Sequence, residues 1–241
     1  MSVRLPIIGS DTEYEVRPSK IIAIGLNYHA HIAESESVRV RGMDGDIPDE
    51  PVLFNKTPNV LIGPGEPIPI PGVLADYPWA NNARTDYEGE LVVVIGKGGK
   101  NIDRAHAPEH IFGYTCGIDV SQRNLQNSDR SGWFRGKSFD GFGPVGPAVL
   151  KGENIDPQEL ELVTHLNGRV VQSSPTSLMI FPVFELISFI SRQLTLEDGD
   201  LIFTGTPAGV GPLADGDVVE VEIGGIGVLS NPVIDERKER S

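Results

Sequence analysis

The sequence predicts a β-dominated α+β fold, and its composition gives the first indication. Glycine (28 residues) and proline (19 residues) are too frequent among the 241 residues for a helical bundle, so many short strands joined by turns are expected. Hydrophobic residues make up 39% of the chain, which is enough for a substantial core. The apolar runs are short, and one stretch near the C-terminus has clear helical spacing.

The first part of the chain contains two clear strands and two connections. Residues 21–25 and 91–95 are short apolar runs typical of buried strands. The segment 35–51 carries mixed charges with glycines and prolines, and it is expected to be a mobile lid. The proline-rich segment 64–72 cannot donate a regular ladder of hydrogen bonds, so an irregular connection is predicted there.

The second part contains further strands and a helix. A helical turn is expected over 108–112, followed by a strand over 113–118. Strands are also predicted over 201–204 and 218–223, the latter because apolar and polar residues alternate. An amphipathic helix with Pro182 in its first turn is predicted from apolar residues at helical spacing, namely Ile180, Val183, Phe184, Ile187, Ile190 and Leu194.

Charge and composition restrict the partners and the compartment. The formal net charge is −14 and no basic stripe is present, which argues against a nucleic-acid partner. No apolar run approaches the ~20 residues of a membrane span, and the N-terminus lacks the form of a signal peptide. The single cysteine, Cys116, excludes an intrachain disulfide and fits a reducing cytoplasm. An anionic substrate would need a local cation, because the chain as a whole repels it.

Two glutamates one residue apart form the most informative candidate site. In an extended chain Glu88 and Glu90 point to the same face, and Gly89 between them has no side chain to block access. Adjacent carboxylates repel unless a proton or a cation neutralises them, and a hard divalent ion is the natural occupant. The alternative is a solvated edge strand whose polar face carries two acids.

Three further features can carry chemistry, each with a structural alternative. On a helical turn Glu34 can orient His31 as a general base, or the two can form a surface ion pair. Asp119 closes an apolar strand, where a carboxylate needs a partner or a metal, or it can cap the segment 120–126. Lys137, in a glycine-rich stretch, can hold a carboxylate or a developing enolate, or it is a solvated loop lysine.

The segment 204–212 is expected to be a rigid turn that presents hydroxyls and backbone amides. Glycine and proline alone would also explain a turn there. Its glycine spacing does not match a nucleotide-binding loop, so a nucleotide is not the expected ligand.

The order of these features resembles the fumarylacetoacetate hydrolase family over residues 21–228. The resemblance is carried by Gly-Leu-Asn-Tyr at 25–28 with His31 and Glu34, Asp-Tyr-Glu-Gly-Glu-Leu at 86–91, Gly-Tyr at 113–114 leading to Asp119, Gly-Lys-Ser-Phe-Asp at 136–140, and Thr-Gly-Thr-Pro at 204–207. The chain is similar to the short members, which include acylpyruvases, oxaloacetate decarboxylases and 2-hydroxyhepta-2,4-diene-1,7-dioate isomerases. It is therefore expected to be a single catalytic domain over 1–241.

The resemblance implies a mixed β-sandwich or β-roll with a few short helices, a homodimer, and a role for each site residue. The expected ligands of Mg²⁺ or Mn²⁺ are Glu88, Glu90 and Asp119. The expected catalytic residues are His31, Glu34 and Lys137, and the expected substrate-binding residues are Arg123, Gln126, Gly205 and Thr206.

Two departures from the family pattern affect substrate choice. Many members read Ser-Ala-Arg-Asp-Leu-Gln where this chain reads Ser-Gln-Arg-Asn-Leu-Gln at 121–126. Asn124 thus lacks a charge that would orient Arg123 or Gln126. The segment 76–84 is longer than usual, and it is expected to reshape the entrance to the site.

The expected activity is a divalent-metal-dependent hydrolase or lyase that cleaves a carbon–carbon bond in small 2-oxo or β-diketo acids. Acylpyruvate hydrolysis, oxaloacetate-type decarboxylation and isomerisation of a 2-hydroxyhepta-2,4-diene-1,7-dioate type share one enolate, so the metal ligands do not discriminate among them. A non-catalytic metal- or anion-binding protein is the rival interpretation. A glycosidase fits poorly, because Glu88 and Glu90 are too close for the carboxylate separation that reaction needs.

Overall fold

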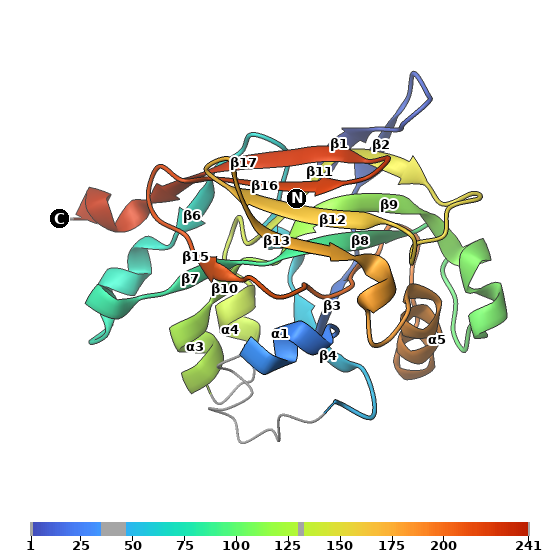
Figure 1. The fold of residues 1–241 in the computed structure, drawn as a ribbon, viewed down its shortest axis with the longest axis horizontal. Helices are drawn as coiled ribbons and strands as arrows, with labels where there is room; N and C mark the ends of the chain where they lie inside the picture. The colour runs from blue at the N-terminus through green and yellow to red at the C-terminus, as the bar shows by residue number, and fades with distance from the viewer. Residues whose placement is uncertain (1, 35–46, 130–132, 241) are drawn as a thin grey trace.

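The computed structural model describes residues 2–34, 47–129 and 133–240, and it consists mostly of strands (Figure 1). A seven-stranded sheet has the order β4-β3-β14-β8-β9-β11-β5, and a five-stranded sheet has the order β13-β12-β16-β17-β6. The first sheet consists of β3 (Ile21–Gly25), β4 (Val52–Lys56), β5 (Leu61–Ile62), β8 (Gly89–Ile95), β9 (Ile111–Ile118), β11 (Gly143–Lys151) and β14 (Leu201–Phe203). The second consists of β6 (Ile68–Ile70), β12 (Glu161–Leu166), β13 (Arg169–Pro175), β16 (Val218–Ile223) and β17 (Gly227–Asp235).

Smaller elements complete the fold, and the predicted β-dominated class with few short helices is confirmed. The remaining strands are β1 (Val3–Pro6), β2 (Glu13–Val16), β7 (Thr85–Tyr87), β10 (Ser121–Gln122) and β15 (Gly211–Pro212). The α-helices are α1 (His29–Glu34), α3 (Arg123–Ser128), α4 (Phe134–Lys137) and α5 (Val183–Gln193). The 3₁₀ turns are η1 (Pro58–Val60), η2 (Gly72–Asp76), η3 (Ala80–Asn82), η4 (Arg104–His110), η5 (Thr176–Leu178) and η6 (Glu236–Arg240).

The two larger sheets pack face to face, with β8, β9 and β11 of the first against β12, β16 and β17 of the second. All seven residues of β8 are buried. A Cβ added at Gly89 would overlap Thr164 Oγ1 of β12 and would lie 3.1 Å from Val221 Cγ2 of β16. The expectation that Gly89 keeps the site open is therefore wrong. Because neighbouring strand residues face opposite ways, Gly89 faces the second sheet while Glu88 and Glu90 face the site.

The C-terminal helix α5 matches its predicted pattern, with small differences at its ends. Pro182 is the N-cap, Ile180 precedes the helix, and Leu194 is the C-cap. Its apolar face is buried through Val183, Leu186, Ile187 and Ile190. Helix α5 packs against η4, which begins before the turn expected at 108–112. β9 then starts at Ile111, earlier than expected.

The prediction of an irregular connection over 64–72 is wrong in its central part. β6 (Ile68–Ile70) pairs in parallel with β17, with Ile68 opposite Val233 and Ile70 opposite Asp235. Ile68 and Ile70 are buried, whereas Pro69 is half-buried. β6 is the outermost strand of its sheet, so its second edge needs no hydrogen bonds and a proline without an N–H is tolerated.

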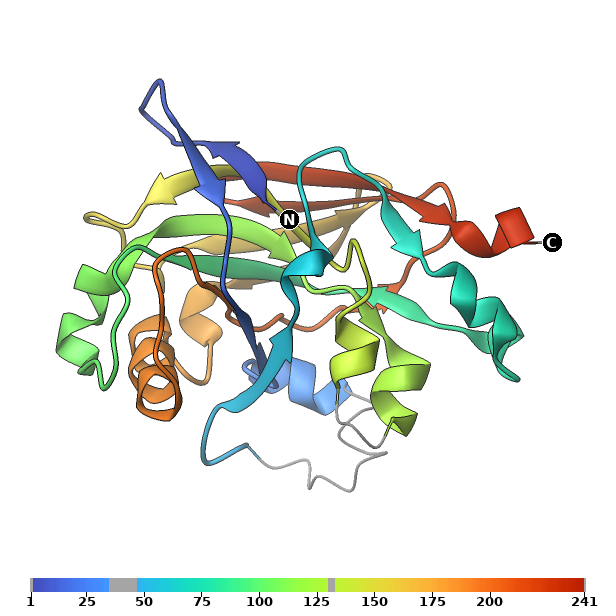
Figure 2. The ribbon, with the colours of Figure 1, turned by 180° about the vertical axis from the view of Figure 1, so that it is seen from behind.

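Three short helices gather beside the seven-stranded sheet and frame the site. α1, α3 and α4 lie side by side in both views of the ribbon (Figures 1 and 2). Of the predicted lid over 35–51, residues 35–46 lie outside the described part of the chain, and 47–51 lead into β4. None of the helices within the described ranges is long and apolar enough to cross a membrane.

Candidate active site and metal centre

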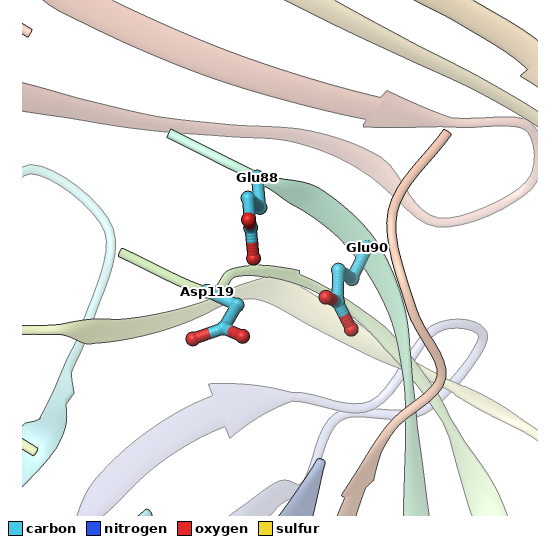
Figure 3. Close-up of side chains that lie close together, drawn as sticks. All are labelled: Glu88, Glu90 and Asp119. Carbon is cyan, nitrogen blue, oxygen red and sulfur yellow. The ribbon is translucent and has the colours of Figure 1, made fainter. Parts of the chain in front are cut away.

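Three carboxylates converge at the ends of two neighbouring strands. Glu88 joins β7 to β8, Glu90 is the second residue of β8, and Asp119 directly follows β9. β8 and β9 are antiparallel, and the Asp119 N–H donates to the Glu88 carbonyl at 2.8 Å, so the chain segments remain in register beyond the strands. One oxygen from each carboxylate lies within 4.8 Å of the other two (Figure 3). The exposed fractions of the three residues are 4%, 1% and 0%, so a solvated edge strand is excluded.

The surroundings of Glu90 show that this cluster fits a hard divalent cation. Its Oε2 accepts the backbone N–H of Gly205 at 2.8 Å, and no lysine or arginine of the described residues forms an ion pair with it. Burial raises the pKa of Glu90 well above its usual value, and the neighbouring Asp119 and Glu88 add to the effect. Three carboxylate ligands suit Mg²⁺ or Mn²⁺, which prefer oxygen donors.

Lys137 and Arg123 neutralise part of the negative charge. Lys137 ends helix α4, and its Nζ lies 2.6 Å from both Glu88 Oε2 and Asp119 Oδ2. It is 2% exposed, so the alternative of a solvated loop lysine is wrong. Arg123 Nη2 lies 2.6 Å from Glu88 Oε1. Burial alone would raise the pKa of Glu88, but Lys137 and Arg123 outweigh it and hold that pKa far below its usual range.

Asp86, rather than position 124, orients Arg123. Arg123 Nε donates to Asp86 Oδ2 at 2.8 Å, and its Nη1 donates to Gln126 Oε1 at 2.8 Å. Asn124, which carries no charge, accepts the backbone N–H of Arg84 at 2.9 Å, and its expected effect on substrate choice stays a prediction. Asp86 was missed, although it stands two residues before Glu88 and therefore on the same face of the strand.

The structure rejects the capping alternative for Asp119. The N-cap of α3 is Gln122, whose Oε1 accepts the Leu125 N–H at 2.8 Å. The two oxygens of Asp119 go instead to two lysines, Oδ2 to Lys137 and Oδ1 to Lys56, the latter at 2.5 Å. Lys56 was also missed. The only sequence signal was a lysine at the end of the apolar strand β4.

His31 and Glu34 form the expected pair on α1. The distance from His31 Nδ1 to Glu34 Oε1 is 3.2 Å; His31 is 7% exposed whereas Glu34 is exposed, so only the imidazole of this pair is buried. Glu34 also accepts the Gly209 N–H, at 2.9 and 3.0 Å to its two oxygens. Burial would raise the pKa of Glu34, but the hydrogen bonds from His31 and Gly209 outweigh it and lower that pKa.

The segment 204–212 supports both groups from one side. The Gly205 N–H holds Glu90, while the Thr206 hydroxyl donates to the Gly89 carbonyl at 2.9 Å and accepts from Gln172 Nε2 at 2.8 Å. These contacts attach Gly205 and Thr206 to Glu90 and to the backbone of β8, and their predicted role in substrate binding stays a prediction.

One cavity is lined by members of the acidic cluster, by His31 and by apolar residues. Its polar lining consists of His31, Glu88, Glu90, Arg123, Gln126, Lys137 and Thr206. Its apolar lining consists of Ile24, Gly25, Leu26, Phe54 and Trp133. The segment 76–84, expected to reshape the entrance, contributes none of these lining residues; its Tyr77 and Trp79 stack on each other with ring centroids 4.5 Å apart.

Comparisons with known proteins agree with this geometry. The family model described as fumarylacetoacetate (FAA) hydrolase, C-terminal, matches residues 20–234. The chain is 40% identical to oxaloacetate tautomerase YisK of Bacillus subtilis, over 90% of this chain and 70% of that protein. It is similar to a fumarylpyruvate hydrolase from Pseudomonas aeruginosa solved with Mn²⁺ and pyruvate, with a TM-score of 0.81 and 32% identity, over 97% and 96% of the two chains.

A further solved structure links the chain to an isomerase. The 2-hydroxyhepta-2,4-diene-1,7-dioate isomerase from Mycobacterium marinum aligns with a TM-score of 0.77 and 39% identity, over 94% of this chain and 82% of that one. Because the family model covers most of the chain and these relatives share its sequence and its fold, the chain belongs to the fumarylacetoacetate hydrolase family.

Proposed function

We propose that this chain is a divalent-metal-dependent enzyme that cleaves a carbon–carbon bond in small 2-oxo or β-diketo acids through an enolate. The observation that carries the proposal is a single cavity lined by three kinds of functional group. They are two glutamates of the buried acidic cluster, a buried imidazole with a carboxylate partner, and two cationic side chains. The Mn²⁺ and pyruvate bound to the similar fumarylpyruvate hydrolase support it.

The metal would be held by Glu88, Glu90 and Asp119. A Mg²⁺ or Mn²⁺ ion at this place supplies a Lewis acid for the ketone oxygen of a 2-oxo acid and so favours enolate formation. Lys137 and Arg123 offset part of the carboxylate charge, and together with a bound dication they would attract the carboxylate of a substrate that the bulk charge of −14 repels.

His31 is the proposed general base. Its Nδ1 faces Glu34, whose lowered pKa keeps that carboxylate ionised and therefore a hydrogen-bond acceptor; with the proton on Nδ1, Nε2 is the nitrogen that accepts a proton. In the hydrolytic reaction His31 takes a proton from the water that attacks the distal carbonyl. Gln126, Gly205 and Thr206 are proposed to contact the substrate, and Gln126 and Thr206 do line the cavity.

The second candidate is an isomerase or tautomerase, in which His31 moves a proton and no water attacks. It is favoured by the names of the relatives, two of which are called oxaloacetate tautomerase, at 41% and 40% identity. Decarboxylation of an oxaloacetate-type acid is a third outcome of the same enolate. The residues of the site serve all three reactions, so the substrate decides among them.

A substrate panel separates these candidates. Acylpyruvates, oxaloacetate and hydroxymuconic-type acids are incubated with Mg²⁺, with Mn²⁺ and with a chelator, and products are identified by ultraviolet spectra and by chromatography. We expect C–C cleavage that depends on metal, and loss of turnover in Glu88→Ala and Asp119→Ala with an unchanged circular dichroism spectrum. Activity that survives the chelator would refute the proposal. Metal binding without turnover of any substrate would favour the non-catalytic alternative.

We also propose that the chain is a single domain that works in the cytoplasm as a homodimer. Membership of the family supports the dimer. Sedimentation velocity tests it, and a monomer at micromolar concentration would contradict it.

A further inference from the structure

Lys56 is a fully buried lysine behind the acidic cluster, with acceptors from two other parts of the chain. It is the last residue of β4, and its side chain is 0% exposed. Its Nζ lies 2.5 Å from Asp119 Oδ1 and 2.6 Å from the Lys137 carbonyl, with a longer contact of 3.5 Å to the Val120 carbonyl. An ammonium group has three N–H donors, so these acceptors occupy all of them.

The contact with Asp119 fixes the orientation of that carboxylate. Lys137 Nζ bridges Asp119 Oδ2 and Glu88 Oε2, so Oδ2 lies on the side of the other acids. Lys56 holds the opposite oxygen, Oδ1. A carboxylate held at both oxygens cannot rotate, and Asp119 is thereby kept facing Glu88 and Glu90.

The contact with the Lys137 carbonyl fixes a second member of the site. Helix α4 has no side-chain cap at its N-terminus, and it ends at Lys137. Lys56 therefore ties the end of this short helix to β4 and sets the point from which the Lys137 side chain reaches the acids. A buried ion pair is often replaceable by apolar residues without loss of stability, so stability alone does not account for a charge at this position.

We propose that Lys56 is a positioning residue of the metal centre, which orients Asp119 for metal binding and places Lys137 beside it. This inference rests on the proposed function, since it requires the three carboxylates to bind a divalent ion. Groups that hold metal ligands from behind typically change metal affinity by roughly 10–100-fold when they are removed.

The test is the Mn²⁺ dissociation constant of purified full-length protein, measured by isothermal titration calorimetry. Lys20→Met is the matched control. Lys20 Nζ lies 2.7 Å from Asp200 Oδ2, a buried carboxylate that precedes β14 and so lies at the end of the sheet away from the site. We expect Lys56→Met to weaken Mn²⁺ binding by roughly 10–100-fold and Lys20→Met to leave it unchanged. Both substitutions remove a lysine from a buried carboxylate, so both lower Tm.

The direction in which Mn²⁺ affinity changes in Lys56→Met shows whether the effect comes from lost orientation of Asp119 or from lost positive charge. Removing a positive charge near three carboxylates would by itself tighten the binding of a cation. Weaker binding in Lys56→Met therefore identifies lost orientation, whereas tighter or unchanged binding overturns the inference and leaves the proposed function intact. Absence of Mn²⁺ binding by the wild type would overturn both.

If Lys56→Met does not fold, a second variant and a second measurement still test the inference. Lys56→Gln retains an N–H donor without the charge, and we expect its Mn²⁺ affinity to fall between those of wild type and Lys56→Met. The visible absorption of bound Co²⁺ reports the ligand geometry directly. We expect it to change in both Lys56 variants and not in Lys20→Met; a wild-type spectrum in Lys56→Gln would contradict the inference.

Discussion

Replacement of Gly89 by alanine tests how closely the two sheets approach beneath the acidic cluster. The added Cβ would fall inside the 3.0 Å that real Cβ atoms keep from other atoms, against Thr164 Oγ1, and at 3.2 Å from Gln172 Oε1. Gly89 cannot easily withdraw, because its N–H donates to Gln172 Oε1 at 3.0 Å and its carbonyl accepts the Thr206 hydroxyl.

Two opposing terms set the size of the effect. Gly89 does not have a positive φ, so alanine would stabilise by about 0.4–1 kcal/mol through the unfolded state. Overpacking a well-packed interior costs about 1–3 kcal/mol, and this overlap belongs at the upper end. The net loss is then about 2 kcal/mol, which corresponds to a fall in Tm of roughly 4–8 °C for a chain of this size.

A double-mutant comparison isolates the clash by differential scanning calorimetry of the metal-free protein. Thr164 Oγ1 is buried and has no hydrogen-bond partner among the described residues, so Thr164→Ala removes the obstacle without breaking a hydrogen bond there. Thr164→Val keeps the bulk and serves as the control. We expect Gly89→Ala/Thr164→Ala to regain most of the lost Tm and Gly89→Ala/Thr164→Val to regain little. A neutral Gly89→Ala, or equal recovery in both pairs, would refute the packing argument.

Three further substitutions probe the charged groups of the site. Because the folded pKa of Glu90 is raised, the stability of the metal-free protein that depends on protonated Glu90 is lost as the pH rises through that pKa. Glu90→Gln should therefore flatten the fall of Tm with pH and abolish the rise of Tm on adding Mn²⁺; an unchanged Mn²⁺ response would exclude Glu90 as a ligand. Glu34→Gln keeps a hydrogen-bond partner for His31 but removes its charge, so kcat should fall on the order of 100-fold while Mn²⁺ affinity stays the same. Asp86→Asn removes the charge that holds Arg123 Nε and leaves its contacts with Glu88 and Gln126, so steady-state kinetics should show a raised KM for carboxylate substrates with a smaller change in kcat; a fall in kcat alone would contradict this.

Local patterns predicted the elements that depend on local sequence. The continuous apolar run predicted β3, a strand that is buried on both faces. The helical spacing of apolar residues predicted α5, which buries one face. β6 escaped prediction because the cost of Pro69 depends on whether its strand lies at an edge, and only the pairing of the whole sheet decides that. The orientation of Gly89 likewise depends on a second sheet whose strands follow much later in the chain.

Site residues could be predicted where spacing along the sequence brings their side chains together. They could not be predicted where a charged side chain is buried by distant parts of the chain. Glu88 and Glu90 share a face by strand geometry, and His31 meets Glu34 within one helical turn. Lys56 was missed because a lysine at the end of a strand is ordinarily solvated, and only the end of α4 and the residue after β9 enclose it.

The turn over 204–212 couples two halves of the proposed chemistry mechanically. The Gly205 N–H donates to Glu90, a proposed metal ligand, and the Gly209 N–H donates to Glu34, the partner of the proposed base His31. Gly209 has a φ of +103°, and an added side chain would overlap the Val171 carbonyl, so the turn does not tolerate a bulkier residue there. Any displacement of this turn would therefore shift Glu90 and, through Glu34, His31 at the same time. The apolar side of the cavity is linked to the site as well, because Lys137 Nζ lies 4.9 Å from the centroid of the Phe54 ring; a substitution of Phe54 would therefore also change the surroundings of Lys137.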